Sequence, residues 1–576
     1  MTGRMRVGTL MGAAALTAFA AMAAPGRVTI LHTNDSHTHV DDAAVPFSQI
    51  AAEVRRMRAA GENVILADAG DFVQGTAMGG YDGGKSVIAI MNAVGYQVAS
   101  PGNHEFDYGI QAFFENQARM TFPLVSCNFI HRERPDEPGA RVLPSYVVVK
   151  AGDVKVAFVG ASTPTTLVSS KPSIFLDPTR RFRAWDFLAG ADGRDLYRAV
   201  QDAVNAAARE ADYVVVIGHL GISPDSAPFR STDVIAHTTN YVALIDGHSH
   251  SEITGRRVRN AAGENVVLTQ SGSYLGVLGS LTLDGGVCVA AGTIYPTAGK
   301  AAEIAQIEEG LSVEVERQLG VRIARAPVAL CAYDPGTKGR LARSQDCGAG
   351  DFAADAAWWY AEAMQGLVCD FALMNGGNVR ADIPAGDVTY KVLRTVQPFG
   401  GDVGVVDASG QQVLDALEFG AQACGAGESG GFLHVAGLTY AVDREIAPTV
   451  KTDASGTWVR GPFGGRYRVH DVKVYDRATA TWRPLDLAKT YRVAGNAFTL
   501  VDGGDGFAMF KGAKIVNNAI AMDYLILAEY AKHFAPDAAG VPLLASAASP
   551  LAKKMRNYRM AYESPQGAGR IVFGRK

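Results

Sequence analysis

The sequence is poor in cysteine, in charge and in long apolar runs, and each shortage argues against a class of protein. Only six of its 576 residues are cysteine and no two of them form a Cys-x-x-Cys pair, which excludes a zinc ribbon and a thioredoxin-type motif. Charged residues make up 19% and the formal net charge is −4, which argues against a broad basic surface for long nucleic acid. Beyond the first residues, no stretch is long and apolar enough to span a membrane.

What is present is typical of a large globular protein. Apolar residues make up 48% of the chain, and 576 residues exceed what one hydrophobic core holds. At roughly 150 residues per domain, two large domains or three or four small ones are expected. No internal repeat is visible, and the Gly-rich segment 420–431 lacks the Lys-Ser/Thr end of a phosphate-binding P-loop.

The first 24 residues have the three parts of a secretory signal. Arg4 and Arg6 precede an apolar stretch over 7–20, and small residues follow up to a cleavage site near Ala24. The alternative is an N-terminal membrane anchor, but the apolar stretch is short for a span of about 20 residues. The sequence therefore predicts a protein that is periplasmic or secreted, with no membrane anchor after cleavage.

Export also permits disulfide bonds. Cys331 and Cys347, with fifteen residues between them, are the first pair to test. Buried free thiols are the alternative.

Short β-branched runs alternate with amphipathic helical stretches over residues 27–298. The runs lie at 28–31, 64–66, 154–159, 214–217 and 242–245. Continuous apolar runs of this length fit strands buried on both faces, and helical stretches between them, such as 50–60, fit a layered α/β domain. A charged helix over 301–319, read as solvated on its charged face, leads into a second α/β segment. The expected division is a catalytic domain over 27–298, a linker helix within 299–322 and a second domain over 323–562.

Side chains of the kinds that bind metals recur where these runs end, in the turns that follow them. They are Asp35, His37, Asp71, Asn103, His219, His248 and His250. Loops at the carboxyl ends of a sheet are where α/β folds bind ligands, so these segments can converge, and the glycines before several of them are expected to turn the chain off its strand. Seven ligands are too many for one tetrahedral ion and suit two ions that share a carboxylate. Imidazole and carboxylate without thiolate suit Zn, Mn, Co or Fe, and two such ions can clamp a phosphoryl oxygen.

These motifs resemble those of a known enzyme family. The motifs are Asp35-x-His37, Gly70-Asp71, Gly102-Asn103-His104-Glu105, Gly218-His219 and Gly247-His248-x-His250. They resemble the signature of the calcineurin-like metallophosphoesterases, and the flanking residues resemble the secreted bacterial 5′-nucleotidase/UDP-sugar hydrolase branch in particular. The resemblance covers residues 27 to 560. It implies an N-terminal four-layer αββα sandwich, a linker helix and a mixed α/β C-terminal substrate-binding domain.

The resemblance also implies a ligand set for two metal ions. One ion would take Asp35, His37, Asp71 and His250. The other would take Asp71, Asn103, His219 and His248, with Asp71 bridging. The family often has glutamine or asparagine where this chain has His250, which leaves the metal preference open.

His104 resembles the family histidine that stabilises the transition state and assists the leaving oxygen. Asp107 would orient it. The alternative for Asp107 is a helix N-cap before residues 110–117. His32 and His39, which flank the first motif, are read as structural or supporting residues.

The second domain resembles the substrate-binding domain of the same family. By position, the candidates are Phe399 and Phe498 for stacking on the base, Arg343 and Arg380 for the phosphate, and Asn375 and Asp505 for the ribose hydroxyls. Two aromatic rings suit the two flat faces of a nucleobase, and arginine suits phosphate. Phe498 and Asp505 are seven residues apart, where the family pattern has six, so the base preference stays open.

The expected function is hydrolysis of nucleoside 5′-monophosphates with two divalent metal ions. The partner is a small nucleotide and not a long nucleic acid, and the oligomeric state is left open. Alternatives on the same site are a 2′,3′-cyclic-nucleotide phosphodiesterase/3′-nucleotidase and a UDP-sugar or dinucleotide pyrophosphatase, and a thiosulfohydrolase is the remote one. A metal-free binding protein that kept the fold is the rival from another class. Rotation of the domains about the linker helix is expected to release product.

Overall fold

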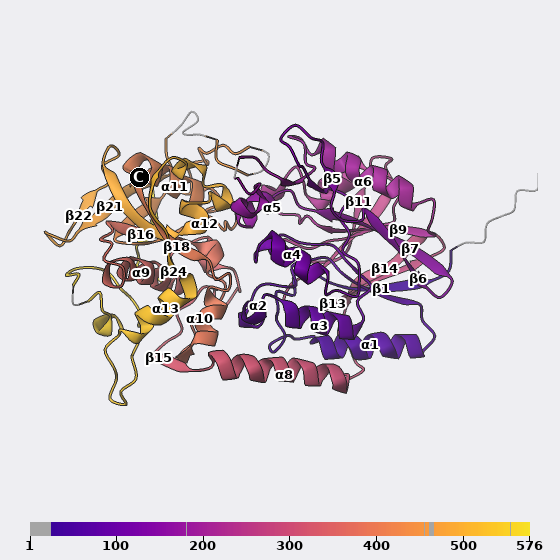
Figure 1. The fold of residues 1–576 in the computed structure, drawn as a ribbon, viewed down its shortest axis with the longest axis horizontal. Helices are drawn as coiled ribbons and strands as arrows, with labels where there is room; N and C mark the ends of the chain where they lie inside the picture. The colour runs from indigo at the N-terminus through magenta and orange to yellow at the C-terminus, as the bar shows by residue number, and fades with distance from the viewer. Residues whose placement is uncertain (1–24, 180, 454–455, 460–465, 553, 576) are drawn as a thin grey trace, which may run out of the picture.

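The computed structural model describes residues 25–179, 181–453, 456–459, 466–552 and 554–575 (Figure 1). The expected signal segment, residues 1–24, lies outside these ranges. The described chain forms two halves joined by one long helix, α8 (Ala302–Leu319). Every sheet of the described residues takes its strands from only one side of α8 in the sequence.

The half before α8 is built on two large sheets. The first has the strand order β14 (Val287–Ile294), β13 (Leu278–Asp284), β1 (Val28–Thr33), β2 (Val64–Asp68), β3 (Val98–Ala99). The second has the order β11 (Glu252–Arg259), β12 (Asn265–Ser271), β10 (Ala243–Ile245), β9 (Tyr213–His219), β7 (Val154–Ser162), β6 (Tyr146–Ala151). β1, β2 and β3 are parallel, as are β7, β9, β10 and β12. Parallel neighbours bring their carboxyl ends to one edge of each sheet.

Successive side chains on these strands point to opposite faces, so each sheet contributes to two cores. In β1, Ile30 packs between the two sheets and Leu31 packs toward the helices outside the first sheet. In β9, Val215 packs between the sheets and Val216 toward the helices outside the second. The outer helices are α1 (Phe47–Ala59) and α3 (Lys85–Val94) on the first sheet, and α6 (Arg194–Ala207) and α7 (Ser231–His237) on the second. This is the four-layer αββα sandwich that the sequence predicts.

The expected strands are all present, and the helix predicted over 50–60 begins earlier, at Phe47. Pro46 is the residue before it, in an extended conformation, and its fixed backbone suits the start of a helix. Phe47 is itself buried in the core beneath α1, which explains why the first turn is helical.

Helix α8 runs along one side of the molecule and bridges the two halves (Figure 1). It packs on α1, α3 and α2 (Ala77–Asp82) of the first half and on α10 (Tyr390–Val396) of the second. The prediction of a fully solvated charged face is wrong at Glu308, which is buried and accepts a hydrogen bond from the Ser48 backbone N at 2.9 Å. The free N–H groups of the first turn of α1 attract this carboxylate.

The half after α8 has a five-stranded central sheet with the order β19 (Leu433–Ala436), β16 (Phe371–Asn375), β23 (Thr490–Asn496), β18 (Asp402–Ser409), β24 (Lys514–Met522). A second sheet follows the order β22 (Thr481–Pro484), β21 (Val469–Asp476), β20 (Leu438–Val442), β25 (Ile571–Phe573). Helices α9 (Gly348–Ala363), α11 (Gly410–Gly420) and α13 (Asp523–Lys532) pack on these sheets. The mixed α/β class expected for this half is confirmed.

The six cysteines all lie in the described residues, and none of them forms a disulfide. The pairing of Cys331 with Cys347 is therefore not found, and both side chains are buried free thiols. Burial raises the pKa of the Cys347 thiol well above its ordinary value, so this group stays unreactive. Among the described residues, no helix has both the length and the apolar character to cross a bilayer.

Candidate metal centre

The seven predicted ligands converge at the carboxyl ends of strands in the first half. The turns after β1, β2 and β3 supply Asp35, His37, Asp71 and Asn103, and β9 and the turn after β10 supply His219, His248 and His250. Two groups of three side chains, Asp35 with His37 and His250, and Asp71 with His219 and His248, each bring one ligand atom per residue within 4.8 Å of the others. Strands distant in sequence thus build one site.

In the first group, Asp35, His37 and His250, the potential ligand atoms lie close together. His250 Nε2 lies 3.1 Å from His37 Nε2 and 3.4 Å from Asp35 Oδ1. His37 Nδ1 lies 2.9 Å from the Gln74 carbonyl, which can only accept, so Nδ1 carries the hydrogen. The lone pair of His37 Nε2 therefore faces the centre of the group, and the backbone bond fixes the ring as in metal-binding histidines.

Asp71, a member of the second group, also lies close to His37 of the first. Asp71 Oδ2 lies 3.0 Å from His219 Nε2 and 3.7 Å from His37 Nε2, so this carboxylate stands between the two groups. His219 Nδ1 donates to the Ala69 carbonyl at 2.6 Å. Asn103 Oδ1 and His248 Nδ1 meet at 2.9 Å. The arrangement places Asp71 where a carboxylate shared by two ions would have to be.

The electrostatics of the site favour an added positive charge. Burial lowers the pKa of His248 to about 3 and that of His37 well below its ordinary value, so both rings are neutral and free to act as ligands. Burial would also lower the pKa of His219, but Asp71 and Asp35 raise it to about 10. The two carboxylates thus draw a proton to His219, and a metal ion can replace that proton. Imidazoles and carboxylates without thiolate fit Zn, Mn, Co or Fe.

Five of the seven predicted ligands have a left-handed backbone although none of them is glycine. Their φ angles are 48° for Asp35, 45° for His37, 62° for Asp71, 75° for His248 and 55° for His250. Such residues are uncommon and collect at functional sites, where the surrounding structure holds them. Here the Asp35 N–H donates to the Gly70 carbonyl at 2.8 Å, which ties the first turn to the second.

The glycines before the ligands serve two different purposes. Gly70 has a φ of 93°, and a Cβ there would lie 2.5 Å from the Gly102 backbone N. Gly102, Gly218 and Gly247 have no left-handed φ, so the expectation that each glycine turns the chain is wrong for them. At Gly102 the reason is space, because a Cβ would lie 2.2 Å from Asp71 Oδ1.

His104 and Asp107 form a dyad at the edge of the metal ligands. His104 Nδ1 lies 2.5 Å from Asp107 Oδ2, and the Ser170 hydroxyl donates to Asp107 Oδ1 at 2.8 Å. Burial opposes a charge on His104, but the Asp107 and Asp71 carboxylates raise its pKa above the ordinary value. The Nε2–H is thereby available as a donor. The alternative role of Asp107 as a helix cap is wrong, because the residue before α4 (Ile110–Gln117) is Gly109.

Glu105, which the sequence places in a motif without a role, holds two ligand-bearing turns together. Its buried carboxylate accepts from the backbone N of Gly102 at 2.6 Å, of Asp71 at 2.8 Å and of Phe72 at 2.8 Å. The turns after β2 and β3 are therefore clasped by one side chain. The only sequence signal for this role is the position of Glu105 directly after His104.

Replacing Glu105 with glutamine is expected to loosen this clasp. An amide presents an N–H₂ where the carboxylate accepts, so at least one buried backbone N–H loses its partner at a cost of about 1–3 kcal/mol. Metal affinity should fall by roughly 10- to 100-fold, as for other residues that orient metal ligands. Denaturant unfolding and metal titration measure the two effects. Glu62→Gln, at an exposed glutamate, is the matched control, and equal metal affinity in both variants would contradict the role.

The second half places several of its predicted residues over this centre. The Phe399 and His104 rings lie 5.6 Å apart between centroids, and the Arg380 guanidinium lies 5.8 Å from the Phe399 ring. Away from these, Asn375 Nδ2 donates to Asp505 Oδ2 at 3.1 Å. Four of the six predicted substrate residues thus form two contacting pairs, and Phe399 of the first pair contacts His104.

The arginines form a cluster that includes one residue the sequence reading missed. Burial, and next the charges of Arg340 and Arg380, lower the pKa of Arg343 to about 9. Arg340 also pairs with Glu428 at 2.5 Å. Like charges gathered in this way suit an anionic ligand. The sequence signal for Arg340 is its position three residues before Arg343, which places both arginines on one short turn.

Three further residues lie outside these contacts. Phe498 is half-buried and packs on Gly504, where a Cβ would lie 2.2 Å from the Phe498 ring. Among the described ring contacts, none joins Phe498 to Phe399. His32 is buried beside the Thr269 hydroxyl at 3.2 Å, and burial lowers its pKa to about 3. His39 pairs with Asp42 at 2.9 Å.

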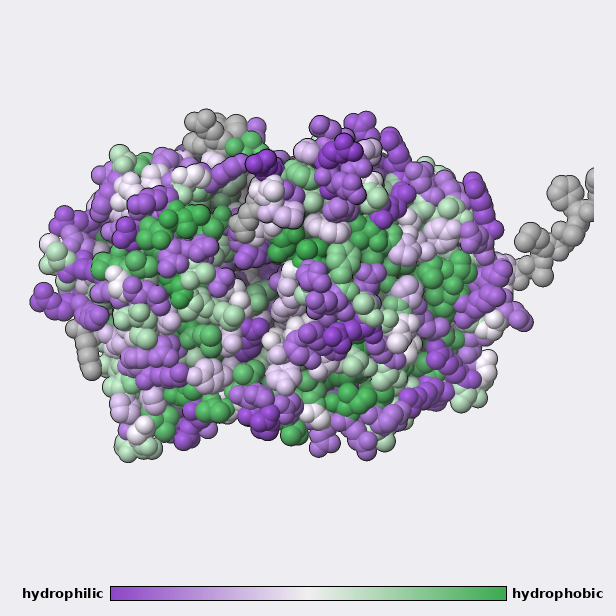
Figure 2. Space-filling model, in the orientation of Figure 1, coloured by the Kyte–Doolittle hydropathy of each residue, from purple (hydrophilic) through white to green (hydrophobic). Residues whose placement is uncertain are grey.

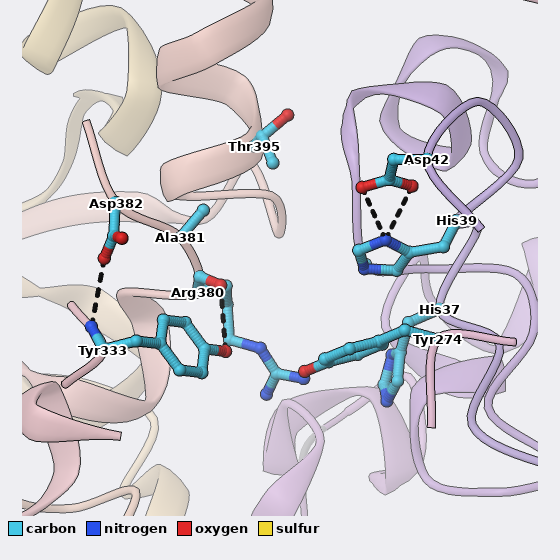
Figure 3. Close-up of a pocket in the computed structure, with 10 residues that line it drawn as sticks. His37, His39, Asp42, Tyr274, Tyr333, Arg380, Ala381, Asp382 and Thr395 are labelled. Carbon is cyan, nitrogen blue, oxygen red and sulfur yellow. Dashed lines mark hydrogen bonds and ion pairs between the residues drawn. The ribbon is translucent and has the colours of Figure 1, made fainter. Parts of the chain in front are cut away.

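A cavity of about 230 Å³ opens beside the first ligand group, between the two halves. His37, His39 and Tyr274 line it from the first half, and Tyr333 and Arg380 from the second (Figure 3). The space-filling view shows the surface hollowed where the halves meet (Figure 2). Both halves thus line the cavity that adjoins His37.

Comparisons with known proteins agree with this geometry. Residues 28–252 match the family model of calcineurin-like phosphoesterases, and residues 322–512 match that of the 5′-nucleotidase C-terminal domain. A snake venom 5′-nucleotidase from Naja atra is 26% identical over 550 residues, which cover 88% of this chain and 96% of the venom protein.

Solved structures share the whole fold. A 5′-nucleotidase precursor from Thermus thermophilus is 25% identical with a TM-score of 0.72, over 96% of this chain and 100% of that one. A sulfate thiohydrolase, also from Thermus thermophilus, is alike in fold. Its TM-score is 0.65 at 17% identity, over 96% of this chain and 97% of that one.

Proposed function

The chain belongs to the calcineurin-like phosphoesterases that carry a 5′-nucleotidase C-terminal domain, and on this premise we propose that it hydrolyses nucleoside 5′-monophosphates to nucleoside and phosphate. The observation that carries the proposal is the contact between Phe399 and His104, whose ring centroids lie 5.6 Å apart. A flat apolar ring beside a phosphoryl-binding centre suits a substrate with a base and a phosphate.

The site is proposed to hold two divalent ions, of Zn, Mn, Co or Fe. Their ligands would be Asp35, His37, Asp71 and His250 for one ion, and Asp71, Asn103, His219 and His248 for the other. Divalent ions there would polarise the phosphoryl group and make water acidic enough to act as a nucleophile at neutral pH. The support is the pair of neighbouring ligand groups and the position of Asp71, which belongs to the second group and lies 3.7 Å from His37 of the first.

The protein's own groups are proposed to stabilise the charge that develops on the phosphoryl oxygens and on the leaving oxygen. His104 would donate its Nε2–H there, and Asp107 would hold the ring through Nδ1 and stabilise its positive charge. Arg343 and Arg380 would bind the phosphate with paired hydrogen bonds. The arginine cluster and the raised pKa of His104 support these roles.

The nucleoside is proposed to bind in the second half. Phe399 and Phe498 would stack on the two faces of the base, and Asn375 and Asp505 would bind the ribose hydroxyls. The hydrogen bond between Asn375 and Asp505 supports a shared role for that pair.

Substrate affinity is expected to depend on pH through Asp505. Burial raises its pKa to about 6, so the carboxyl is ionised above that pH and neutral below it. A neutral carboxyl loses acceptor capacity for the ribose hydroxyls. KM for AMP should therefore rise as the pH falls below about 6, and Asp505→Asn should remove this inflection. A KM that is flat from pH 5 to 8 in the unsubstituted protein would argue against the role.

The function is tested by a substrate panel with Mn²⁺, Zn²⁺, Co²⁺ and Mg²⁺. We expect phosphate release from AMP to exceed that from UDP-glucose and 2′,3′-cyclic AMP. Faster turnover of either of the latter would transfer the function to a pyrophosphatase or a cyclic phosphodiesterase. No stoichiometric metal and no hydrolysis with any of the four ions would leave only a binding protein.

We further propose that residues 1–24 are a signal peptide and that the protein is periplasmic or secreted, on the sequence pattern of that segment. The proposed domains are 27–298 for catalysis, 299–322 as linker and 323–562 for substrate binding. N-terminal sequencing of the exported protein tests the cleavage site near Ala24. Rotation of the two halves during turnover stays a prediction.

A further inference from the structure

Tyr274 has a left-handed backbone conformation in the loop of the first half that faces the candidate metal centre. It lies between β12 and β13, with a φ of 60°, and the next residue, Leu275, has a φ of 52°. Its backbone N–H donates to the carbonyl of Asp35, a predicted ligand, at 2.8 Å. A left-handed aromatic residue is sterically costly, so the surrounding structure must hold it in place.

The ring of Tyr274 packs on two imidazoles of the first ligand group. Its centroid lies 5.6 Å from that of His37 and 5.3 Å from that of His250, and both pairs meet edge to face. A third contact, at 4.3 Å, joins it to the His39 ring. The Tyr274 ring thus contacts both predicted ligands, and it lines the cavity between the halves together with His37.

The hydroxyl of Tyr274 points the other way, toward the second half. Figure 3 shows it directed at the Arg380 guanidinium, with the Tyr333 ring on the far side of that group. The Tyr333 hydroxyl donates to the Arg380 carbonyl at 3.2 Å. Tyr274 therefore contacts two predicted ligands of the first group with its ring, and its hydroxyl faces an arginine that is predicted to bind phosphate.

We propose that Tyr274 is a positioning residue with two separable parts. Its ring sets the orientation of His37 and His250, and its hydroxyl, which faces the Arg380 guanidinium, holds that side chain over the metal centre. The proposal rests on the proposed nucleotidase function for the second part, whereas the first part concerns metal binding alone. A side chain that merely filled space would need neither a hydroxyl directed at Arg380 nor the edge-on contacts with both imidazoles.

The experiment separates the ring from the hydroxyl in the full-length protein. Tyr274→Leu removes the ring and should weaken Mn²⁺ binding by roughly 10- to 100-fold in calorimetric titration, while Tyr274→Phe should restore it. Tyr274→Phe and Tyr333→Phe should each raise KM for AMP by roughly 3- to 10-fold, the worth of one hydrogen bond, with little change in kcat. Because both hydroxyls act on Arg380, the increase in KM in the double variant should be smaller than the product of the two single increases.

Tyr295→Phe, at a tyrosine that is 69% exposed, is the matched control and should change neither readout. Unchanged Mn²⁺ affinity in Tyr274→Leu would overturn the role of the ring. Additive effects of Tyr274→Phe and Tyr333→Phe on KM, or no effect of either, would overturn the role of the hydroxyl. If the unsubstituted protein does not hydrolyse AMP, the nucleotidase function fails, and the Mn²⁺ titrations still decide whether the ring positions the ligands.

Discussion

The Asp71→Ala protein is expected to lose stoichiometric metal and to hydrolyse AMP at least about 10³-fold more slowly, because metal ions supply several kcal/mol of transition-state stabilisation. Asp71 stands between the two ligand groups, 3.0 Å from His219 Nε2 and 3.7 Å from His37 Nε2. Removing its carboxylate takes a ligand from both ions and half of the negative charge that attracts them. Metal analysis after dialysis, together with phosphate release, measures both losses.

Asp71→Asn refines this experiment. The amide keeps the shape of the side chain and an oxygen that can accept from the His104 backbone N–H, now 2.8 Å from Asp71 Oδ1. It lacks the charge, so metal should still be lost while the fold is kept. Asp153→Ala, at an exposed carboxylate, should behave as the unsubstituted protein. Full metal content in Asp71→Ala would show that the shared carboxylate is not a ligand.

The His104→Ala protein is expected to keep its metal and to lose roughly 10²- to 10⁴-fold in kcat, the range for a positioned proton donor. His104 makes its bonds to Asp107 and, through its backbone, to Asp71, but a ring nitrogen also lies within 4.8 Å of ligand atoms of His37 and Asp71. The paired readouts, metal content and turnover, separate this variant from those of the ligands.

A good leaving group makes the test of His104 sharper. If the Nε2–H assists the departing 5′-oxygen, the loss in His104→Ala should be smaller for an aryl phosphate, whose phenolate leaves without a proton, than for AMP. Asp107→Asn should show the same pattern with a smaller loss, because the ring keeps its place and loses only part of its charge. Full activity of His104→Ala on AMP would remove His104 from the mechanism.

The convergence of the seven candidate ligands could be predicted from the sequence because most of them follow a β-branched run. Parallel strands such as β1 and β2 must bring their carboxyl ends together. The αββα layers follow from the same runs, since residues such as Ile30 and Leu31 are both apolar and both buried. Local chemistry and strand direction together were enough for this part of the site.

The supporting residues could not be predicted in the same way. Glu105 accepts from backbone N–H groups of another turn, Ser170 donates to Asp107 from 63 positions further along the sequence, and the Tyr274 hydroxyl faces Arg380 across the boundary between the halves. No periodicity records such contacts, because they depend on where separate loops meet. The prediction for Glu308 is wrong for the same reason. Its charge predicts a solvent-exposed side chain, but the side chain is buried against the N-terminus of α1.

The left-handed backbone at the candidate metal ligands sets stability against the proposed activity. A strained non-glycine residue costs on the order of 1–3 kcal/mol, and five candidate ligands have that conformation, at Asp35, His37, Asp71, His248 and His250. Glycine at any of these positions would relieve strain and would also remove a candidate ligand. Selection of thermostable variants without an activity screen would therefore tend to enrich inactive proteins. Their substitutions would be concentrated at these five positions of the candidate metal centre.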